Sequence, residues 1–390
     1  MRRTLSSSFR LALPGALAAA ALVAGAVAAA QNRPCPPGRH DSVGQCCGAG
    51  EEWVPARTRC MCVDGVEACR VPPPPPEPVT PPPPPPPVVP SARCPEGMVL
   101  VAGGSFNLGA DASQTVAEPS ERPAHRVTLE PYCLDRNEVN VQRFQECVSS
   151  GACVMEGGVN LPSIPPAQLP AWNQLCNGAH ADRGDHPMNC VSYAQAQSYC
   201  GFRRGRLPTE AEWEFAARGS EGRLFPWGDL APTVARVNAC DADCVALLRR
   251  LGLPTPSASF AGNDTHGSTG PVGSFAGGNA SSGLADLAGN VGEWTGDWFA
   301  PYGAAPASNP TGPAGGDQRV VRGGHWYSGN PAALRSSART PAPPSLRLAT
   351  VGFRCMHAPI IELPPPPPVA PPPVEEAPAE RPTRRRHGGR

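Results

Sequence analysis

Proline limits what this chain can fold into. The stretch from Val71 to Pro90 is almost continuously proline, which fixes φ and removes the backbone N–H, so this stretch cannot form a helix or a central strand. We expect it to extend as polyproline II, at about 3.1 Å per residue, into a spacer of roughly 60 Å. A second, shorter run lies at Pro364 to Pro373. With 53 prolines and 42 glycines in 390 residues, the packed core must be much smaller than the chain.

The N-terminal residues have the pattern of a secretory signal. Arg2 and Arg3 precede an apolar run from Leu11 to Ala30, which ends in small residues suited to cleavage. An uncleaved membrane anchor is the alternative interpretation of the same run. No later segment is apolar enough to span a bilayer, so we expect no transmembrane helix after signal removal. The chain is therefore expected in the periplasm, the cell envelope or the extracellular space.

Cysteines fall into two even groups on either side of the proline spacer. Six precede it and ten follow it, so each group can close its own disulfides in an oxidising compartment. Zinc binding by the first group is the alternative, but the adjacent Cys46-Cys47 and the Cys60-x-Cys62 spacing do not match paired CxxC ligands. Export and disulfide formation thus support each other.

These features predict five segments and a small set of regular elements. The segments are a signal peptide at 1–30, a six-cysteine disulfide module at 31–70, a proline-rich linker at 71–93, a main domain at 94–359, and a proline-rich, basic, disordered tail at 360–390. In the main domain, Val99 to Leu108 is predicted to be a hairpin that turns at Gly103-Gly104. Helices are predicted at Asn140 to Val148 and after the capping boxes Ser192–Gln195 and Thr209–Glu212, with short strands and long loops from Pro226 to Phe353.

Composition excludes several functions. All 33 basic residues are arginine, so Schiff-base and pyridoxal-phosphate chemistry have no lysine to use. The formal net charge of zero gives no general attraction to nucleic acid. Histidines are dispersed without an H-E-x-x-H pattern, which argues against a zinc hydrolase. The arginine-rich end from Arg381 to Arg390 could touch anionic envelope surfaces or remain a solvated end.

Eight motifs, in order, carry a family resemblance. They include RLPTEAEWE and GNVGEW, and they occupy Gly97–Gly109, His125–Phe144, His186–Cys200, Gly205–Gly219, Phe225–Gly228, Gly283–Trp298, Val321–Trp326 and Val351–Cys355. This succession resembles the formylglycine-generating enzyme (sulfatase-modifying factor) family. The resemblance implies an irregular, loop-rich α+β fold related to C-type lectins and stabilised by calcium. It also implies a disulfide between Cys200 and Cys355.

The resemblance also shows what the chain lacks. Family members that make formylglycine use two cysteines shortly after a GGSW-like motif to bind copper(I), and oxidise a sulfatase cysteine with oxygen. Here Ser328 stands at the first of these positions, beside His325 and Trp326, and no cysteine follows before Cys355. Copper(I) prefers soft thiolates, which a serine hydroxyl cannot replace. Copper binding and the family's catalysis are therefore not expected at this degenerate site.

Two calcium sites are implied by the same resemblance. The second site would take side-chain oxygens from Asp286 and Glu293, which we expect to converge on one ion, and carbonyls from Gly289 and Val291. The first would use the side chains of Asn238 and Asp264 with the carbonyls of Ala239 and His266, around an insertion that brings in Cys240 and Cys244. Ordinary solvated acids are the alternative for Asp286 and Glu293.

Three functions follow from these observations. The first is a non-catalytic, calcium-stabilised binding or structural module of the cell envelope, whose cleft binds an unidentified peptide, protein or glycan. The second is a metal-dependent oxidoreductase of the formylglycine-generating family that acts on protein cysteine through a relocated metal site. The third is a purely architectural envelope protein. The missing thiolates argue against the second.

Overall fold

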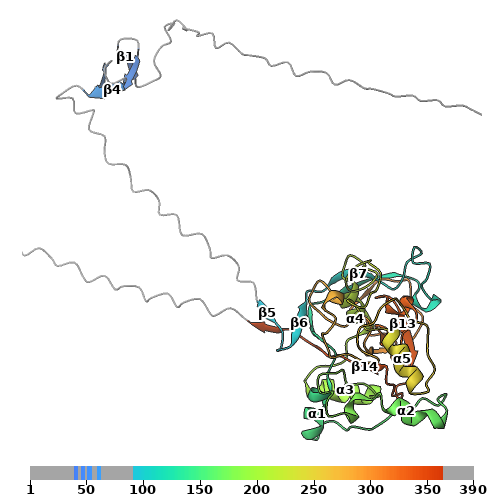
Figure 1. Cartoon of the computed structure of the whole chain (residues 1–390). Helices are drawn as coiled ribbons and strands as arrows, with labels where there is room; N and C mark the ends of the chain where they lie inside the picture. The colour runs from blue at the N-terminus through green and yellow to red at the C-terminus, as the bar shows by residue number, and fades with distance from the viewer. Residues whose placement is uncertain (1–38, 43–44, 49–50, 55–58, 63–90, 363–390) are drawn as a thin grey trace, which may run out of the picture. The chain divides into compact units, whose positions relative to one another are not determined.

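The computed structural model describes residues 39–42, 45–48, 51–54, 59–62 and 91–362, in two separate units (Figure 1). The signal peptide, the linker up to residue 90, the tail beyond residue 362 and the pairing of the first six cysteines lie outside the described residues. In the N-terminal unit, β1 (Arg39–Ser42) pairs antiparallel with β2 (Gln45–Gly48), and β3 (Glu51–Val54) with β4 (Arg59–Cys62). No helix in the described residues is long and apolar enough to cross a membrane.

Two segments of the main unit, 98–108 and 125–135, each contribute one strand to each of two sheets. β7 (Gly104–Leu108) pairs with β8 (His125–Leu129), and β6 (Met98–Val101) pairs with β9 (Tyr132–Asp135), in two different sheets. The predicted hairpin between the halves of 99–108 is therefore wrong. Gly103-Gly104 instead bends one strand from one sheet into the next, with φ of 71° and 131°. A Cβ at Gly103 would lie 2.4 Å from the Leu129 carbonyl oxygen, so only glycine fits this crossing.

Short strands complete these two sheets and close the unit. β11 (Ala307–Ser308) runs parallel to β8, and β15 (Met356–His357) runs antiparallel to β9. β5 (Ser91–Arg93) pairs with β16 (Ile360–Glu362), so the folded unit extends a little beyond the expected limits of 94–359 at both ends. The expected tail thus begins with a paired strand, because the residues at 360–362 find backbone partners at 91–93.

A four-stranded sheet brings the sequence motifs together. Its order is β13 (Arg339–Ala342), β12 (Arg319–Arg322), β10 (Gly292–Trp298) and β14 (Val351–Gly352). β10 is antiparallel to β12 and parallel to β14, and Glu293 lies opposite both Arg322 and Gly352. The motifs GNVGEW, VRGGHW and VGFRC, which are far apart in sequence, therefore meet at one point of this sheet.

In residues 91–362 the predicted helices are present, together with two helices that the sequence patterns did not predict. α1 (Val141–Ser149) is capped by Asn140, and capping boxes open α3 (Tyr193–Phe202) and α4 (Glu210–Arg218), as predicted. α5 (Ala242–Arg250) lies in the region predicted to hold only strands and loops, and Asp241 caps it by accepting from the backbone N–H groups of Asp243 and Cys244. The other helical turns are α2 (Leu169–Asn173) and 3₁₀ turns at Pro119–Glu121, Pro166–Gln168, Asn177–Ala179, Ala276–Gly278 and Pro331–Leu334.

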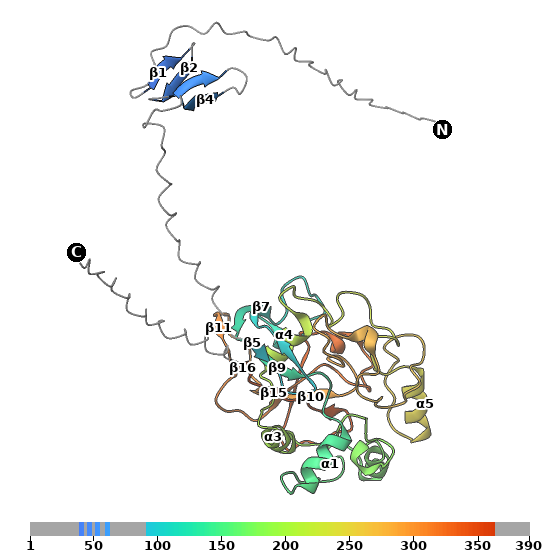
Figure 2. The same ribbon diagram turned by 90° about the vertical axis from the view of Figure 1, so that its left-hand side faces the viewer.

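Aromatic packing and disulfides hold these elements together. Phe144 of α1, Tyr199 of α3 and Phe353 form a buried aromatic cluster, with ring centroids 5.5 to 6.2 Å apart. α1 and α3 lie at the same end of the unit in both views (Figure 1, Figure 2). Cys200 and Cys355, the pair implied by the family resemblance, form a disulfide. Residues 91–362 hold four more disulfides, Cys94–Cys133, Cys147–Cys153, Cys176–Cys190 and Cys240–Cys244.

Candidate functional site

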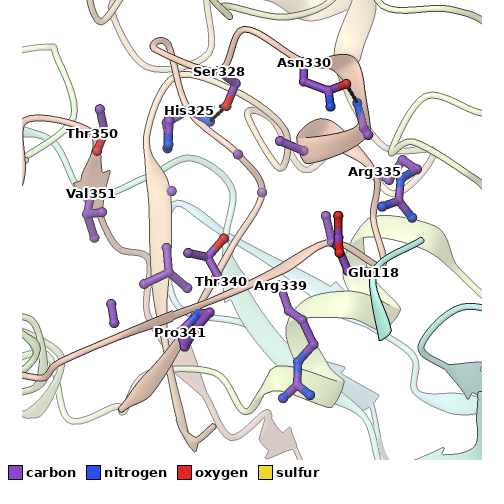
Figure 3. A pocket seen from close by; sticks show the side chains of 18 of the residues that line it. Glu118, His325, Ser328, Asn330, Arg335, Arg339, Thr340, Pro341, Thr350 and Val351 are labelled. Atoms are coloured by element: carbon purple, nitrogen blue, oxygen red, sulfur yellow. Dashed lines mark hydrogen bonds between the residues drawn. The ribbon is translucent and has the colours of Figure 1, made fainter. Parts of the chain in front are cut away.

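A pocket of about 280 Å³ lies beside β13 and the loop that follows β12 (Figure 3). Its apolar wall includes Val321, Ala342, Leu346, Leu348 and Val351. Its polar lining includes His325, Ser328, Asn330, Arg335, Arg339, Thr340 and Thr350. A concave, mostly apolar site with a few convergent polar groups is the usual form of a ligand pocket.

The sequence placed Ser328 and His325 in a degenerate site, and both line this pocket. Ser328 is only 5% exposed, and its Oγ accepts a hydrogen bond from the His325 backbone N–H at 3.1 Å and lies 3.3 Å from Nδ1 of the same residue. Trp326, the third residue of the expected site, does not line the pocket. It is fully buried, and its Nε1 donates to the Ala349 carbonyl at 2.9 Å, so it belongs to the core.

No thiolate is available at this pocket. All ten cysteines from 91 to 362 are joined in disulfides, and none of them lines the pocket. Copper(I) needs soft sulfur ligands, whereas the pocket offers hydroxyls, an imidazole and an amide. The described residues therefore do not fit a copper centre of the family's kind.

Burial controls the protonation of His325. Removal from water lowers its pKa to about 4, because the imidazolium loses hydration on burial. The side chain is therefore a neutral imidazole near pH 7. Neutral histidine can accept a proton at one ring nitrogen while it carries one on the other.

Buried ion pairs form the far wall of the pocket. Arg335 bonds both oxygens of Glu121, with its Nη2 2.7 Å from Oε1, and Arg339 bonds both oxygens of Glu210, with its Nη2 2.6 Å from Oε2. Hydrogen bonds from Arg335 and Ser337 lower the pKa of Glu121 against the opposing effect of burial, which is the largest single influence. Sequence reasoning missed these pairs because their partners are more than a hundred residues apart.

Both carboxylate oxygens of Glu293 accept hydrogen bonds from buried donors. Its Oε1 accepts from Arg354 Nη2 at 2.6 Å, and its Oε2 accepts from Arg354 Nε at 2.7 Å and from Trp213 Nε1 at 2.8 Å. Glu293 and Arg354 are both fully buried. Arg354 thus places a positive charge beside Glu293, while calcium binding by Glu293 stays a prediction.

Asp286 lies near Glu293 and a third acid that the sequence analysis missed. Asp286 has a φ of 55°, and its Oδ2 accepts from the Gly273 backbone N–H at 2.5 Å. Burial raises its pKa to about 6, with a further contribution from Glu293. The missed acid is Glu138, which is 1% exposed and has a pKa raised well above its ordinary value by burial, Asp286 and Glu293. Its position within the motif from His125 to Phe144 was the available signal.

The backbone between Asp286 and Glu293 contacts Glu138. Val291 N–H donates to Glu138 Oε1 at 3.0 Å, and Asn290 Nδ2 donates to Oε2 at 2.7 Å. Gly289 has a φ of 77°, and a Cβ there would lie 2.2 Å from the Asn238 carbonyl oxygen. Three buried acids and one arginine therefore surround this turn, and a bound cation would favour the ionised form of the acids whose pKa burial raises.

At the other expected calcium site, Asp264 lies in a cluster of three aspartates. Oxygens of Asp241, Asp243 and Asp264 lie within 4.8 Å of one another and could hold a metal ion. Asp264 Oδ2 is buried and has no hydrogen-bond partner among the described residues. Burial raises the pKa of Asp264 to about 7, and Asp241 and Asp243 add to the shift. Asp241 and Asp243 were not among the expected ligands, and both lie within the small loop closed by Cys240–Cys244.

The remaining residues expected at that site have other contacts. Asn238 Nδ2 donates to the Ser268 carbonyl at 2.8 Å and to Asn290 Oδ1 at 3.2 Å, while Ala239 is buried next to it. His266 N–H donates to Asp264 Oδ1 at 2.8 Å. These contacts use nitrogen donors, so calcium binding by the oxygens of Asn238, Ala239 and His266 stays a prediction beside the aspartate triad.

Comparison with known proteins confirms the family resemblance that the sequence motifs carry. Residues 86–359 match the family described as "Sulfatase-modifying factor enzyme 1-like domain". The formylglycine-generating enzyme of Streptomyces coelicolor is 32% identical over 294 residues, which cover 67% of this chain and 90% of that protein. The mouse protein "Inactive C-alpha-formylglycine-generating enzyme 2" is 31% identical over 289 residues, which cover 66% and 84%. PvdO from Pseudomonas aeruginosa shares the fold, with a TM-score of 0.52 and 24% identity over 68% of this chain and 94% of PvdO.

Proposed function

The chain belongs to the sulfatase-modifying factor family, and we propose that it is an exported member without copper-dependent oxidase activity that acts as a binding or structural module of the cell envelope. One observation carries this proposal: the pocket contains Ser328 and no cysteine. The family includes relatives named as enzymes and relatives named as inactive, so loss of the chemistry has precedent within it.

Export is supported by the sulfur chemistry of the main unit. Five disulfides in one domain are typical of an oxidising compartment and uncommon in the cytosol. The signal-like residues 1–30 and the proline-rich spacer suit a domain displayed at a distance from its anchor or partner. A relationship to C-type lectins, which the family resemblance implies, suits a ligand-binding role for the cleft.

Calcium is the proposed structural ion. Glu138 and Asp286 would hold one ion, with carbonyls of Gly289 and Val291, while Glu293 remains bonded to Arg354. The triad of Asp241, Asp243 and Asp264 would hold another. Calcium favours hard carboxylate and carbonyl oxygens, and it would relieve the repulsion among these buried acids. Ion binding of this kind stabilises only the folded state.

Copper binding and oxygen uptake test the loss of oxidase activity. The purified full chain is incubated with copper(I), oxygen and a cysteine-containing CxPxR peptide, and peptide mass and oxygen consumption are followed. We expect no stoichiometric copper(I) binding and no conversion of the cysteine to an aldehyde. Substantial conversion would support the oxidoreductase alternative and overturn the proposal.

A pocket-filling variant separates binding from a purely architectural role. Thr340 is an exposed residue of β13 at the pocket wall, so Thr340→Trp should fill the pocket while the core remains intact. If the pocket binds a ligand, cells that produce this variant should behave like cells without the protein. Wild-type behaviour would favour the architectural role.

A further inference from the structure

We propose that Ser328 and His325 form a nucleophile–base pair that accepts an acyl group from short carboxylic esters bound in the pocket. This activity goes beyond the proposed binding role and differs from the family's oxidation of cysteine. It uses the same pocket, but its success or failure does not depend on any metal.

The hydrogen-bond pattern leaves the Ser328 proton available to the imidazole. Ser328 Oγ already accepts the His325 backbone N–H at 3.1 Å, so the hydroxyl hydrogen must be donated elsewhere. Nδ1 of His325 lies 3.3 Å from the same oxygen. With the imidazole neutral, Nδ1 can accept that hydrogen while Nε2 carries the ring proton. A hydroxyl beside a neutral imidazole is the usual arrangement of an activated serine.

The loop that carries Ser328 is held by several fixed contacts. The Ser328 carbonyl accepts from Cys240 N–H at 3.0 Å and from Ser259 Oγ at 2.7 Å. Trp326 anchors the same turn through its N–H to the Asn290 carbonyl and its ring nitrogen to the Ala349 carbonyl. A nucleophile held in this way needs little rearrangement to react, which favours catalysis.

Asn330 would supply the donor for the developing oxyanion, and the pocket has space for an acyl group. Asn330 lines the pocket, its Oδ1 accepts from Ala332 N–H at 3.0 Å, and its Nδ2 has no acceptor among the described residues. Side-chain amides of this kind stabilise tetrahedral intermediates. The apolar wall and the volume of about 280 Å³ suit a short acyl chain.

The proposed reaction is a simple acyl transfer. Ser328 Oγ attacks the ester carbonyl carbon as His325 Nδ1 takes the hydroxyl proton, and a new C–O bond forms. The tetrahedral intermediate collapses, the bond to the leaving alcohol breaks, and His325 returns the proton to that alcohol. Water then hydrolyses the acyl-serine by the same route, which releases the carboxylic acid and restores Ser328. No oxidant or reductant takes part.

A fluorophosphonate probe and p-nitrophenyl butyrate test the proposal on the purified full chain. We expect one phosphonylated residue, mapped to Ser328 by peptide mass spectrometry, and ester hydrolysis that Ser328→Ala abolishes. His325→Gln keeps the backbone contact to Ser328 but removes the base, and should slow labelling by roughly 100-fold or more. Asn330→Ala should lower kcat with little change in KM.

The controls separate reaction from misfolding and from nonspecific labelling. Ser198→Ala removes an exposed hydroxyl on α3 and should label as the wild type does. Melting curves of each variant show whether it is folded. Absence of a Ser328 adduct on the wild-type chain, or hydrolysis that persists in Ser328→Ala, overturns the proposal. Either result would leave the binding proposal standing, since the Thr340→Trp variant tests that one separately.

Discussion

Arg354 donates hydrogen bonds from Nη2 and Nε to the two carboxylate oxygens of Glu293, at 2.6 and 2.7 Å, and both side chains are fully buried. The same guanidinium also donates to the carbonyls of Asp135, Arg136 and Ala285. This pair therefore connects the motif VGFRC to GNVGEW and to the turn after β9.

Removal of Arg354 should be costly. Arg354→Met leaves Glu293 buried without its counter-ion, and breaking one side of a buried pair costs about 3–5 kcal/mol. Denaturant unfolding measures the loss. The matched control is Arg347→Met, since Arg347 pairs with Glu156 near the surface, where such pairs contribute about 0–1 kcal/mol. Equal effects of the two variants would contradict the structural role assigned to Arg354.

The Cys200–Cys355 disulfide should contribute more than its local counterparts. It closes a loop with a sequence separation of 155, which corresponds to about 5 kcal/mol in the chain-entropy model. Cys147–Cys153, with a separation of 6, corresponds to about 2 kcal/mol in the same model. The double variants Cys200→Ala/Cys355→Ala and Cys147→Ala/Cys153→Ala should therefore differ clearly in unfolding free energy. A larger loss from the shorter loop would refute the entropic explanation.

Chelation should lower the melting temperature if calcium binds as proposed. At calcium concentrations about a hundred times the Kd, one site contributes roughly 2.7 kcal/mol. Asp286→Asn should reduce the sensitivity to chelator at one site, and Asp264→Asn at the other. Glu293→Ala, which the sequence would suggest, is less informative because it also leaves Arg354 without a partner. Identical melting curves with calcium and with excess chelator would rule out a structural ion.

Restoration of one thiol should not restore oxidation. Ser328→Cys returns sulfur to the first copper position, but the second position still lacks a cysteine and every other cysteine from 91 to 362 is in a disulfide. Copper(I) binding by a thiolate pair therefore remains impossible. We expect neither the wild type nor this variant to convert a CxPxR peptide to the aldehyde. Conversion by the variant alone would show that a single thiolate suffices.

Asp297 should make the fold less stable as pH rises. Burial, and then Glu210, raise its pKa from an ordinary value of 3.8 to about 7, while its Oδ2 accepts from the Glu210 backbone N–H at 2.7 Å. The folded state therefore favours the protonated acid. The free-energy cost of ionising Asp297 on folding is absent below pH 4, grows between about pH 4 and 7, and is complete above that range. Each pKa unit corresponds to about 1.4 kcal/mol.

Asp297→Asn tests this dependence because the amide oxygen can still accept from the helix N–H. Relative to the wild type, the variant should have a higher melting temperature at pH 8 than it has at pH 4.5. Ser198→Ala, a change at an exposed position on α3, serves as the comparison. A difference that does not change with pH would show that Asp297 is ionised at no cost in the folded protein.

Local signals in the sequence were sufficient for several features. The caps at Asn140, Ser192 and Thr209 open helices because each side chain accepts a backbone N–H of the first turn, a contact that spans only three residues. The absence of a thiol at Ser328 is likewise a property of residue type. The disulfide of Cys200 with Cys355 followed from the family resemblance, not from local pattern.

Tertiary structure decided what depends on distant partners. Gly103-Gly104 has the composition of a hairpin turn, but the close approach of the Leu129 carbonyl makes it a bend between two sheets. The ion pair of Glu293 with Arg354 depends on the parallel pairing of β10 with β14, which brings residues 61 positions apart into contact. The burial of Glu138 near Asp286 likewise depends on contacts with residues more than 150 positions away in the sequence, Asn290 and Val291. The sequence alone therefore determined the caps, the missing thiolate and the exclusion of lysine chemistry. Packing decided which charges face one another in the core, because Coulomb and desolvation energies depend on distance and burial, which no local pattern records.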